Sequence, residues 1–146
     1  MGKLSRALEA KIRQQANNRC GYCLNPQALT AYKLEIEHLY PKALGGETVE
    51  GNLWLACSGC NGHKALKTRT VDPLTRKTVR LFNPRTQDWR EHFEFSQDKV
   101  EIIGKTACGR ATVVSLQLNN FYQRTARRAW VEAGLFPLED VDEQIG

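Results

Sequence analysis

Two Cys-x-x-Cys pairs constrain this chain more than any other feature. Cys20 and Cys23 form the first pair, and Cys57 and Cys60 form the second. Two such pairs bring four thiolates together, which is the donor set of a closed, tetrahedral zinc site. Four sulfur ligands leave no open position for a substrate, so we expect this Zn²⁺ to be structural. Because zinc bound in this way contributes about 10–16 kcal/mol of apparent free energy, it would decide the local fold.

Cysteine usage also indicates the compartment. The chain has five cysteines, and four of them fall into zinc-type pairs, which argues against the disulfide framework of a secreted protein. No apolar run approaches the ~20 residues that span a bilayer, and mixed charges rather than a signal-peptide core follow Met1. We therefore expect a cytoplasmic protein with no membrane segment. The remaining cysteine, Cys108, is expected to be a small buried hydrophobe.

The charge balance bounds the choice of partner. The 146 residues carry a net charge of +5, and 25% of them are charged. A basic chain permits nucleic acid, or another polyanion, as a partner without identifying it. A chain of this length also buries about two-thirds of its unfolded surface, so a hydrophobic core can form beside the metal.

The residues between and after the cysteine pairs carry the chemistry. The segment before His38 alternates like a half-buried strand, and Pro41 requires the chain to leave the sheet soon afterwards. Neighbours on a regular strand point to opposite faces, so Glu37 and His38 share a pocket only if the backbone twists or breaks between them. Asn52 opens the returning strand, and Asn61 directly follows the last cysteine.

These motifs, in this order, resemble those of the HNH endonuclease family. The resemblance covers roughly the first half of the chain and implies a β-hairpin and a helix around one catalytic metal ion. It implies that His38 is the general base and that Glu37 binds the divalent cation. It also implies that Asn52 holds the loop and orients the histidine. Asn61 takes the third motif position as a neutral oxygen ligand, which suits Mg²⁺ or Mn²⁺.

His63 competes with Asn61 for that metal position. Residues advance by about 100° each around a helix, so Asn61 and His63 point to different sides and only one of them can face Glu37. The helical angle and the register of the motif both favour Asn61.

The rest of the chain predicts helices and one further hairpin. Apolar residues at a spacing of four predict an amphipathic helix over residues 4–16. Alternation in 92–95 and 99–103, around a turn, predicts a β-hairpin. Helical spacing from about 110 to 133 predicts one long helix, and the segment 139–146 is an acidic tail.

We therefore expect an α+β fold. A zinc-stapled ββα-metal module of the HNH or treble-clef kind would be followed by a β-hairpin and a long C-terminal helix. Residues 1–70 would hold the N-terminal helix and the nuclease module, and residues 71–146 would pack on that module. The whole chain would form a single compact domain.

Basic residues outside the motif are expected to hold the DNA backbone, because phosphate contacts set position and affinity rather than sequence preference. Three lie just past the start of the expected catalytic helix and three share a face of the expected last helix: Lys64, Lys67, Arg69, Arg124, Arg127 and Arg128. For the last helix, a solvated charged face is the alternative.

The function predicted from these patterns is metal-dependent hydrolysis of DNA phosphodiester bonds, by nicking or double-strand cleavage. A homodimer is compatible with it, since two symmetric protomers would give staggered cuts. The competing prediction is a noncatalytic, zinc-dependent module that binds nucleic acid. Metal-dependent nicking of a plasmid distinguishes the two.

Overall fold

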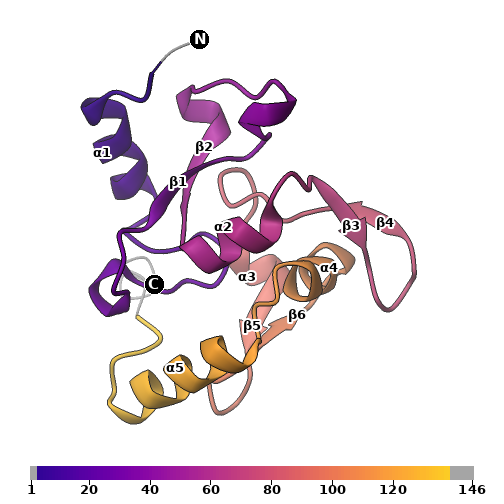
Figure 1. Cartoon of the computed structure of the whole chain (residues 1–146). Helices are drawn as coiled ribbons and strands as arrows, with labels where there is room; N and C mark the ends of the chain where they lie inside the picture. The colour runs from indigo at the N-terminus through magenta and orange to yellow at the C-terminus, as the bar shows by residue number, and fades with distance from the viewer. Residues whose placement is uncertain (1–2, 139–146) are drawn as a thin grey trace.

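The computed structural model describes residues 3–138, which form an α+β fold with short helices and small antiparallel sheets (Figure 1). The acidic tail expected at 139–146 lies outside the described residues. The elements in chain order are α1 (Arg6–Gln15), β1 (Glu35–His38), β2 (Leu53–Ala56), α2 (Ser58–Lys64), β3 (Arg69–Val71), β4 (Thr78–Arg80), α3 (Trp89–His92), β5 (Phe93–Phe95), β6 (Ile102–Gly104), α4 (Ala107–Ser115) and α5 (Phe121–Glu132).

The first half is a hairpin followed by a helix, as predicted. β1 pairs with β2 in an antiparallel ladder that places Glu37 opposite Trp54. Cys57 is the N-cap of helix α2: its sulfur accepts a hydrogen bond from the backbone N–H of Cys60. The predicted N-terminal helix is also confirmed: Ser5 caps α1, and the helix packs on β2.

The second half contains two hairpins within the described residues, where the sequence predicted one. β5 and β6 form the expected hairpin. β3 and β4 form another, and Arg69 lies opposite Arg80 in its register. Sequence reasoning did not find this hairpin, because strands of three residues are too short to show a periodic pattern.

The single long helix predicted over 110–133 is wrong. The structure has two helices, α4 and α5, separated by residues 116–120. Gln117 takes a positive φ of 51°, which ends the helical path. The side chain of Asn119 then accepts from the N–H of Ile102 and donates to its carbonyl oxygen, each at 2.8 Å. Asn120 caps α5 by accepting from the N–H of Gln123.

Arg127 is a buried structural residue, so its prediction as a DNA contact is wrong. Its side chain is completely buried. The guanidinium donates to the carbonyl oxygens of Val100 and Leu118 and to the side chain of Asn119. These bonds tie α5 to the turn that precedes it and to the β5–β6 hairpin. The helical pattern placed Arg127 beside Arg124 and Arg128, but the face it occupies turns inward.

One hydrophobic cluster contains residues from both halves of the chain. Tyr22 and Leu55 from the first half share it with Phe82, Phe93 and Leu118 from the second. The indole N–H of Trp89 also donates to the carbonyl oxygen of Tyr22 at 2.8 Å. The second half therefore supports the loop that carries the first cysteine pair. None of the helices within residues 3–138 is long and apolar enough to cross a membrane.

Candidate functional site

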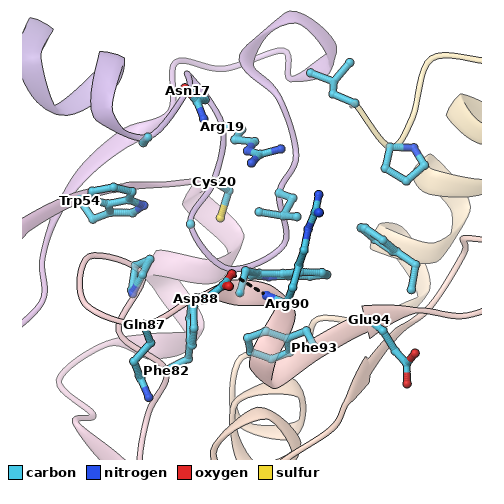
Figure 2. Close-up of a pocket in the computed structure, with 18 of the residues that line it drawn as sticks. Asn17, Arg19, Cys20, Trp54, Phe82, Gln87, Asp88, Arg90, Phe93 and Glu94 are labelled. Atoms are coloured by element: carbon cyan, nitrogen blue, oxygen red, sulfur yellow. Dashed lines mark hydrogen bonds between the residues drawn. The ribbon is translucent and has the colours of Figure 1, made fainter. Parts of the chain in front are cut away.

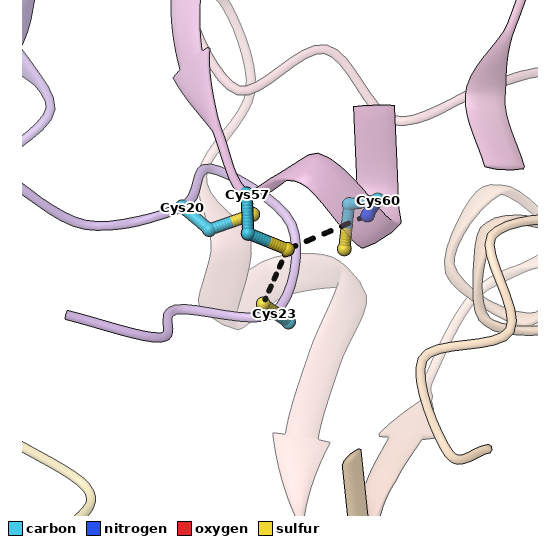
Figure 3. A group of neighbouring side chains, drawn as sticks. All are labelled: Cys20, Cys23, Cys57 and Cys60. Atoms are coloured by element: carbon cyan, nitrogen blue, oxygen red, sulfur yellow. Dashed lines mark hydrogen bonds between the residues drawn. The ribbon is translucent and has the colours of Figure 1, made fainter. Parts of the chain in front are cut away.

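The four paired cysteines converge on one point (Figure 3). Their sulfur atoms all lie within 4.8 Å of one another, and all four side chains are buried. Cys20 and Cys23 come from the loop after α1, Cys57 follows β2, and Cys60 lies in the first turn of α2. Four convergent thiols with no disulfide among them form a metal-binding cluster with the donor set of structural zinc. The predicted ligand set is confirmed as a cluster.

The surroundings shift the pKa values of two of these thiols in opposite directions. Burial raises the pKa of Cys20, whereas hydrogen bonds from the neighbouring thiols, that of Cys20 first, lower the pKa of Cys57. Backbone N–H groups also point at the sulfurs: Tyr22 donates to Cys20 and Cys60 donates to Cys57, each at 3.4 Å. A dication would favour the thiolate at all four positions, because zinc binding releases the thiol protons.

Glu37 forms a buried ion pair with Lys64. The two side chains are 0% and 4% exposed, and Lys64 Nζ lies 3.2 Å from Glu37 Oε1. The hydroxyl of Tyr22 donates to the same oxygen at 2.8 Å. Burial raises the pKa of Glu37, and the Lys64 ammonium and the Tyr22 hydroxyl oppose that shift. The other oxygen, Oε2, is buried and has no hydrogen-bond partner.

Glu37 Oε2 is a suitable ligand atom for a divalent cation, because it is buried and has no hydrogen-bond partner. A buried carboxylate oxygen without a partner is costly, and a cation would satisfy it. Oε1 is already bound to Tyr22 and Lys64, so Oε2 is the Glu37 oxygen that a cation could use.

Lys64 is internal, which contradicts its prediction as a DNA contact. Besides pairing with Glu37, its ammonium donates to the carbonyl oxygens of His38 at 3.4 Å and Leu39 at 3.2 Å. These two carbonyls lie where the chain leaves β1. Lys64 therefore fixes the backbone where the chain leaves β1. The ladder itself continues through Glu37 and His38, so the break considered between these two residues is not present.

His38 is half-buried beside the loop that follows β1. Its Nε2 lies 2.9 Å from the hydroxyl of Thr48. Burial, and then the charges of Lys42 and Lys64, lower the pKa of His38. The imidazole is therefore neutral at pH 7, which is the state that a general base requires.

Asn52 clamps that same loop. Its carbonyl oxygen accepts from the N–H of Tyr40 at 2.8 Å, and its amide donates to the carbonyl oxygens of Tyr40 and Glu47 at 3.1 and 2.9 Å. Gly46 lies against the same backbone, where any Cβ would overlap the carbonyl oxygen of Tyr40. The loop after His38 is therefore held at both ends.

Asn61 meets a carboxylate that the sequence did not single out. Its amide donates to Glu35 Oε1 at 2.8 Å, so it contacts Glu35 and not Glu37. Strand periodicity carried a signal for this contact. Glu35 and Glu37 share one face of β1, and Glu35 pairs with Ala56, next to the start of α2. His63 is two residues further along α2, and within residues 3–138 it makes no hydrogen bond with Glu35 or Glu37.

The comparisons with known proteins agree with this geometry. The family model of the HNH endonuclease matches residues 20–66, and this part of the chain is an HNH endonuclease domain. The chain is also 30% identical over 109 residues to the Septu protein PtuB of Bacillus mycoides (strain KBAB4). That alignment covers 58% of this chain and 37% of the relative, so the chain spans less than half of the relative's length. No solved structure gives a significant match.

A cavity of about 670 Å³ lies elsewhere in the molecule (Figure 2). Its lining includes Cys20, Trp54 and Trp89, together with residues 136–138. Glu37, His38, Asn52 and Asn61 are not among the described residues that line it. The cavity is therefore separate from those four residues but adjoins the cysteine cluster at Cys20, and its aromatic walls belong largely to the shared core.

Zinc content tests the cysteine cluster. We expect the purified protein to hold about one Zn²⁺ per chain, since four thiolates complete its coordination. Substitution Cys60→Ser should release the metal and unfold the α2 region, because the binding free energy is also folding free energy. Atomic absorption and amide hydrogen exchange measure the two effects. Cys108→Ser, outside the cluster, is the matched control and should keep its zinc; a metal-free but folded wild type would contradict the assignment.

The Glu37–Lys64 pair predicts a strongly non-additive mutant cycle. Lys64→Met should lower the free energy of unfolding by about 3–5 kcal/mol, because it leaves Glu37 charged and buried without its partner. The double variant Glu37→Gln/Lys64→Met should recover part of this loss. Denaturant unfolding in zinc-containing, magnesium-free buffer measures both.

The exposed pair Lys11–Glu50, with side chains 56% and 42% exposed, supplies the control for that cycle. Lys11→Met should cost less than about 1 kcal/mol. Equal losses for Lys64→Met and Lys11→Met would show that the internal pair is not desolvated.

Proposed function

We propose that this protein is an endonuclease that hydrolyses DNA phosphodiester bonds with His38 as general base and one divalent cation. The observation that carries the proposal is the buried, unpartnered oxygen of Glu37 next in sequence to a histidine whose pKa is lowered. A binding module needs neither feature. The HNH domain at residues 20–66 supplies the reaction class.

In this proposal Glu37 Oε2 and the carbonyl oxygen of Asn61 hold the cation. Carboxylate and amide oxygens suit Mg²⁺ or Mn²⁺. His63 is the competing ligand. The ion would stabilise the charge that develops on the phosphate and on the leaving oxygen.

The chain's own groups position and activate the attacking water. Thr48 holds Nε2 of His38, so Nδ1 is the nitrogen that we assign to take the water's proton. The water oxygen then bonds to phosphorus while the P–O3′ bond breaks, giving a 5′ phosphate and a 3′ hydroxyl. Asn52 fixes the loop that carries Thr48, and Lys64 fixes the backbone of His38 itself.

A second candidate function rests on the ion pair of Glu37. With Oε1 bound to both Lys64 and Tyr22, the module could use Glu37 purely for packing and bind nucleic acid without cutting it. The HNH fold would then be a zinc-stapled binding scaffold. The two candidates differ in one measurable outcome, strand scission.

Several further features belong to the proposal. Four metal-binding thiols need a reducing compartment, so we assign the protein to the cytoplasm. DNA contacts are proposed for the exposed cations Lys67, Arg69, Arg124 and Arg128. Both halves are proposed to fold as one domain, and a homodimer would allow cuts in both strands.

Substitution His38→Ala should abolish plasmid nicking in Mg²⁺ or Mn²⁺ and leave zinc content and DNA affinity nearly unchanged. General-base groups contribute about 10²–10⁴-fold to rate. Agarose-gel nicking with a chelator control measures the loss, and His92→Ala is the matched histidine control. Retardation of DNA without scission in the wild type would favour the binding module. Undiminished nicking by His38→Ala would remove the proposed base.

Glu35 is proposed to position Asn61. The NH₂ group of Asn61 donates to Glu35 Oε1, which leaves the side-chain carbonyl oxygen of Asn61 as the atom that would hold the cation. Groups that orient a metal ligand in this way typically change metal affinity by about 10–100-fold. Glu35→Ala should therefore weaken Mn²⁺ binding by that factor, whereas Glu35→Gln, which keeps an acceptor, should bind nearly as the wild type.

Electron paramagnetic resonance of Mn²⁺ in a His38→Ala background measures this affinity without cleavage. Adding Glu35→Ala to Asn61→Ala should cost little more than Asn61→Ala alone, because Glu35 acts through the asparagine. Equal losses for Glu35→Gln and Glu35→Ala would instead make Glu35 a direct, charged ligand.

A further inference from the structure

The net charge of the chain is concentrated on one hairpin. Residues 67–80 carry five cations and a single carboxylate, Asp72, so their net charge is +4 against +5 for the whole chain. Lys67 donates to the carbonyl oxygen of Ser115. The other four, here named the hairpin cations, are exposed: Arg69, Arg76, Lys77 and Arg80.

Asp72 does not neutralise these charges. It is completely buried, and both its oxygens accept from Arg110 of α4, at 3.0 and 2.9 Å. The Arg110 guanidinium lowers the pKa of Asp72, so the carboxylate stays ionised within that pair. Across residues 3–138, no carboxylate lies within ion-pair distance of a hairpin cation.

The ladder presents two of the hairpin cations outward, and the other two, Arg76 and Lys77, are exposed in the segment that joins the strands. Arg69 lies directly opposite Arg80, so both side chains leave the same face of the hairpin. Thr70 and Val79 are half-buried on the opposite face, and both strands contact α4. Like charges directly opposite one another destabilise an antiparallel pair. This arrangement therefore costs stability unless an anion covers it.

The hairpin is also held rigidly. Asp72 accepts from the backbone N–H groups of Leu74 and Thr75 and from the Thr75 hydroxyl, at 3.2, 3.2 and 2.8 Å. The same carboxylate fixes the turn and joins it to Arg110. In Figure 1 the β3–β4 hairpin extends away from the zinc module. The cations thus project on a preorganised arm, which lowers the entropy lost on binding.

We propose that the β3–β4 hairpin is an arm that binds the phosphate backbone of duplex DNA. A two-stranded ribbon fits the major groove, which is about 12 Å wide, and unpaired arginines on its outer face match phosphates. The arm follows α2 directly in the chain, so it would hold the duplex beside the site that α2 helps to form. The choice of duplex DNA rests on the proposed function.

Salt dependence of binding tests the arm. Four Gln substitutions at the hairpin cations, in a His38→Ala background, should reduce the slope of log affinity against log salt by about 3.6, because each lost phosphate contact removes about 0.9. Fluorescence anisotropy with a short labelled duplex measures the slope. Binding is read without cleavage, so an inactive wild type would sink the proposed nuclease and leave this inference testable.

A charge-matched control lies on the N-terminal side of the chain. Gln substitutions at Lys3, Arg6, Lys11 and Lys33 remove the same charge, and the slope should stay at its wild-type value. An equal reduction of the slope in the two variants would show that only net charge matters, and it would overturn the proposed role of the hairpin. An unchanged slope in the hairpin variant would overturn it as well.

The double variant Arg69→Gln/Arg80→Gln distinguishes an effect on DNA binding from an effect on folding. Relief of the like-charge contact should raise the thermal midpoint, while the slope should fall by about 1.8. A role confined to folding would move stability and binding in the same direction, so parallel losses would contradict the proposal.

Discussion

The convergence of four buried cysteines is the constraint on which the rest of this fold depends. Sulfur atoms within 4.8 Å of one another cannot all ionise in an apolar interior unless a cation offsets their charge. The cluster joins the loop after α1 to the junction of β2 and α2, and thereby sets where α2 crosses the hairpin. Glu35 meets Asn61, and Glu37 meets Lys64, only because that crossing is fixed.

The buried pair of Glu37 and Lys64 exchanges stability for geometry. Desolvating two charges costs several kcal/mol per ion before their attraction is counted, and packed apolar residues would hold α2 on β1 at lower cost. What an apolar pair could not do is bind the carbonyl oxygens of His38 and Leu39 and leave one carboxylate oxygen facing inward without a partner. The buried ion pair therefore serves mainly to fix the backbone at the end of β1.

Sequence reasoning succeeded where one short-range rule decided the structure. Cys-x-x-Cys spacing, the alternation before His38 and the four-residue period of α1 were each sufficient. It failed where a side chain replaced a backbone partner or turned inward. The side chain of Asn119 hydrogen-bonds to the backbone of Ile102 as a neighbouring strand would, and this interrupts a helix although the apolar period continues in the sequence. Arg127 and Lys64 stand at positions where the pattern predicts surface residues, but both are buried. The partner of Asn61 needed the register of β1 against β2, which fixes Glu35 beside α2 and which no spacing within a single segment contains.

The indole hydrogen bond from Trp89 to the carbonyl oxygen of Tyr22 couples metal loading to assembly of the two halves. Tyr22 lies inside the first cysteine pair, so an ion that orders this loop would also stabilise the hydrogen bond from Trp89. By thermodynamic reciprocity, that hydrogen bond would in turn strengthen ion binding. A shortened chain that ends before residue 89 would then hold zinc more weakly although it keeps every sulfur ligand. In this sense residues 20–66 would not be an independent metal-binding unit, because their zinc affinity would also depend on residues that follow them in the chain.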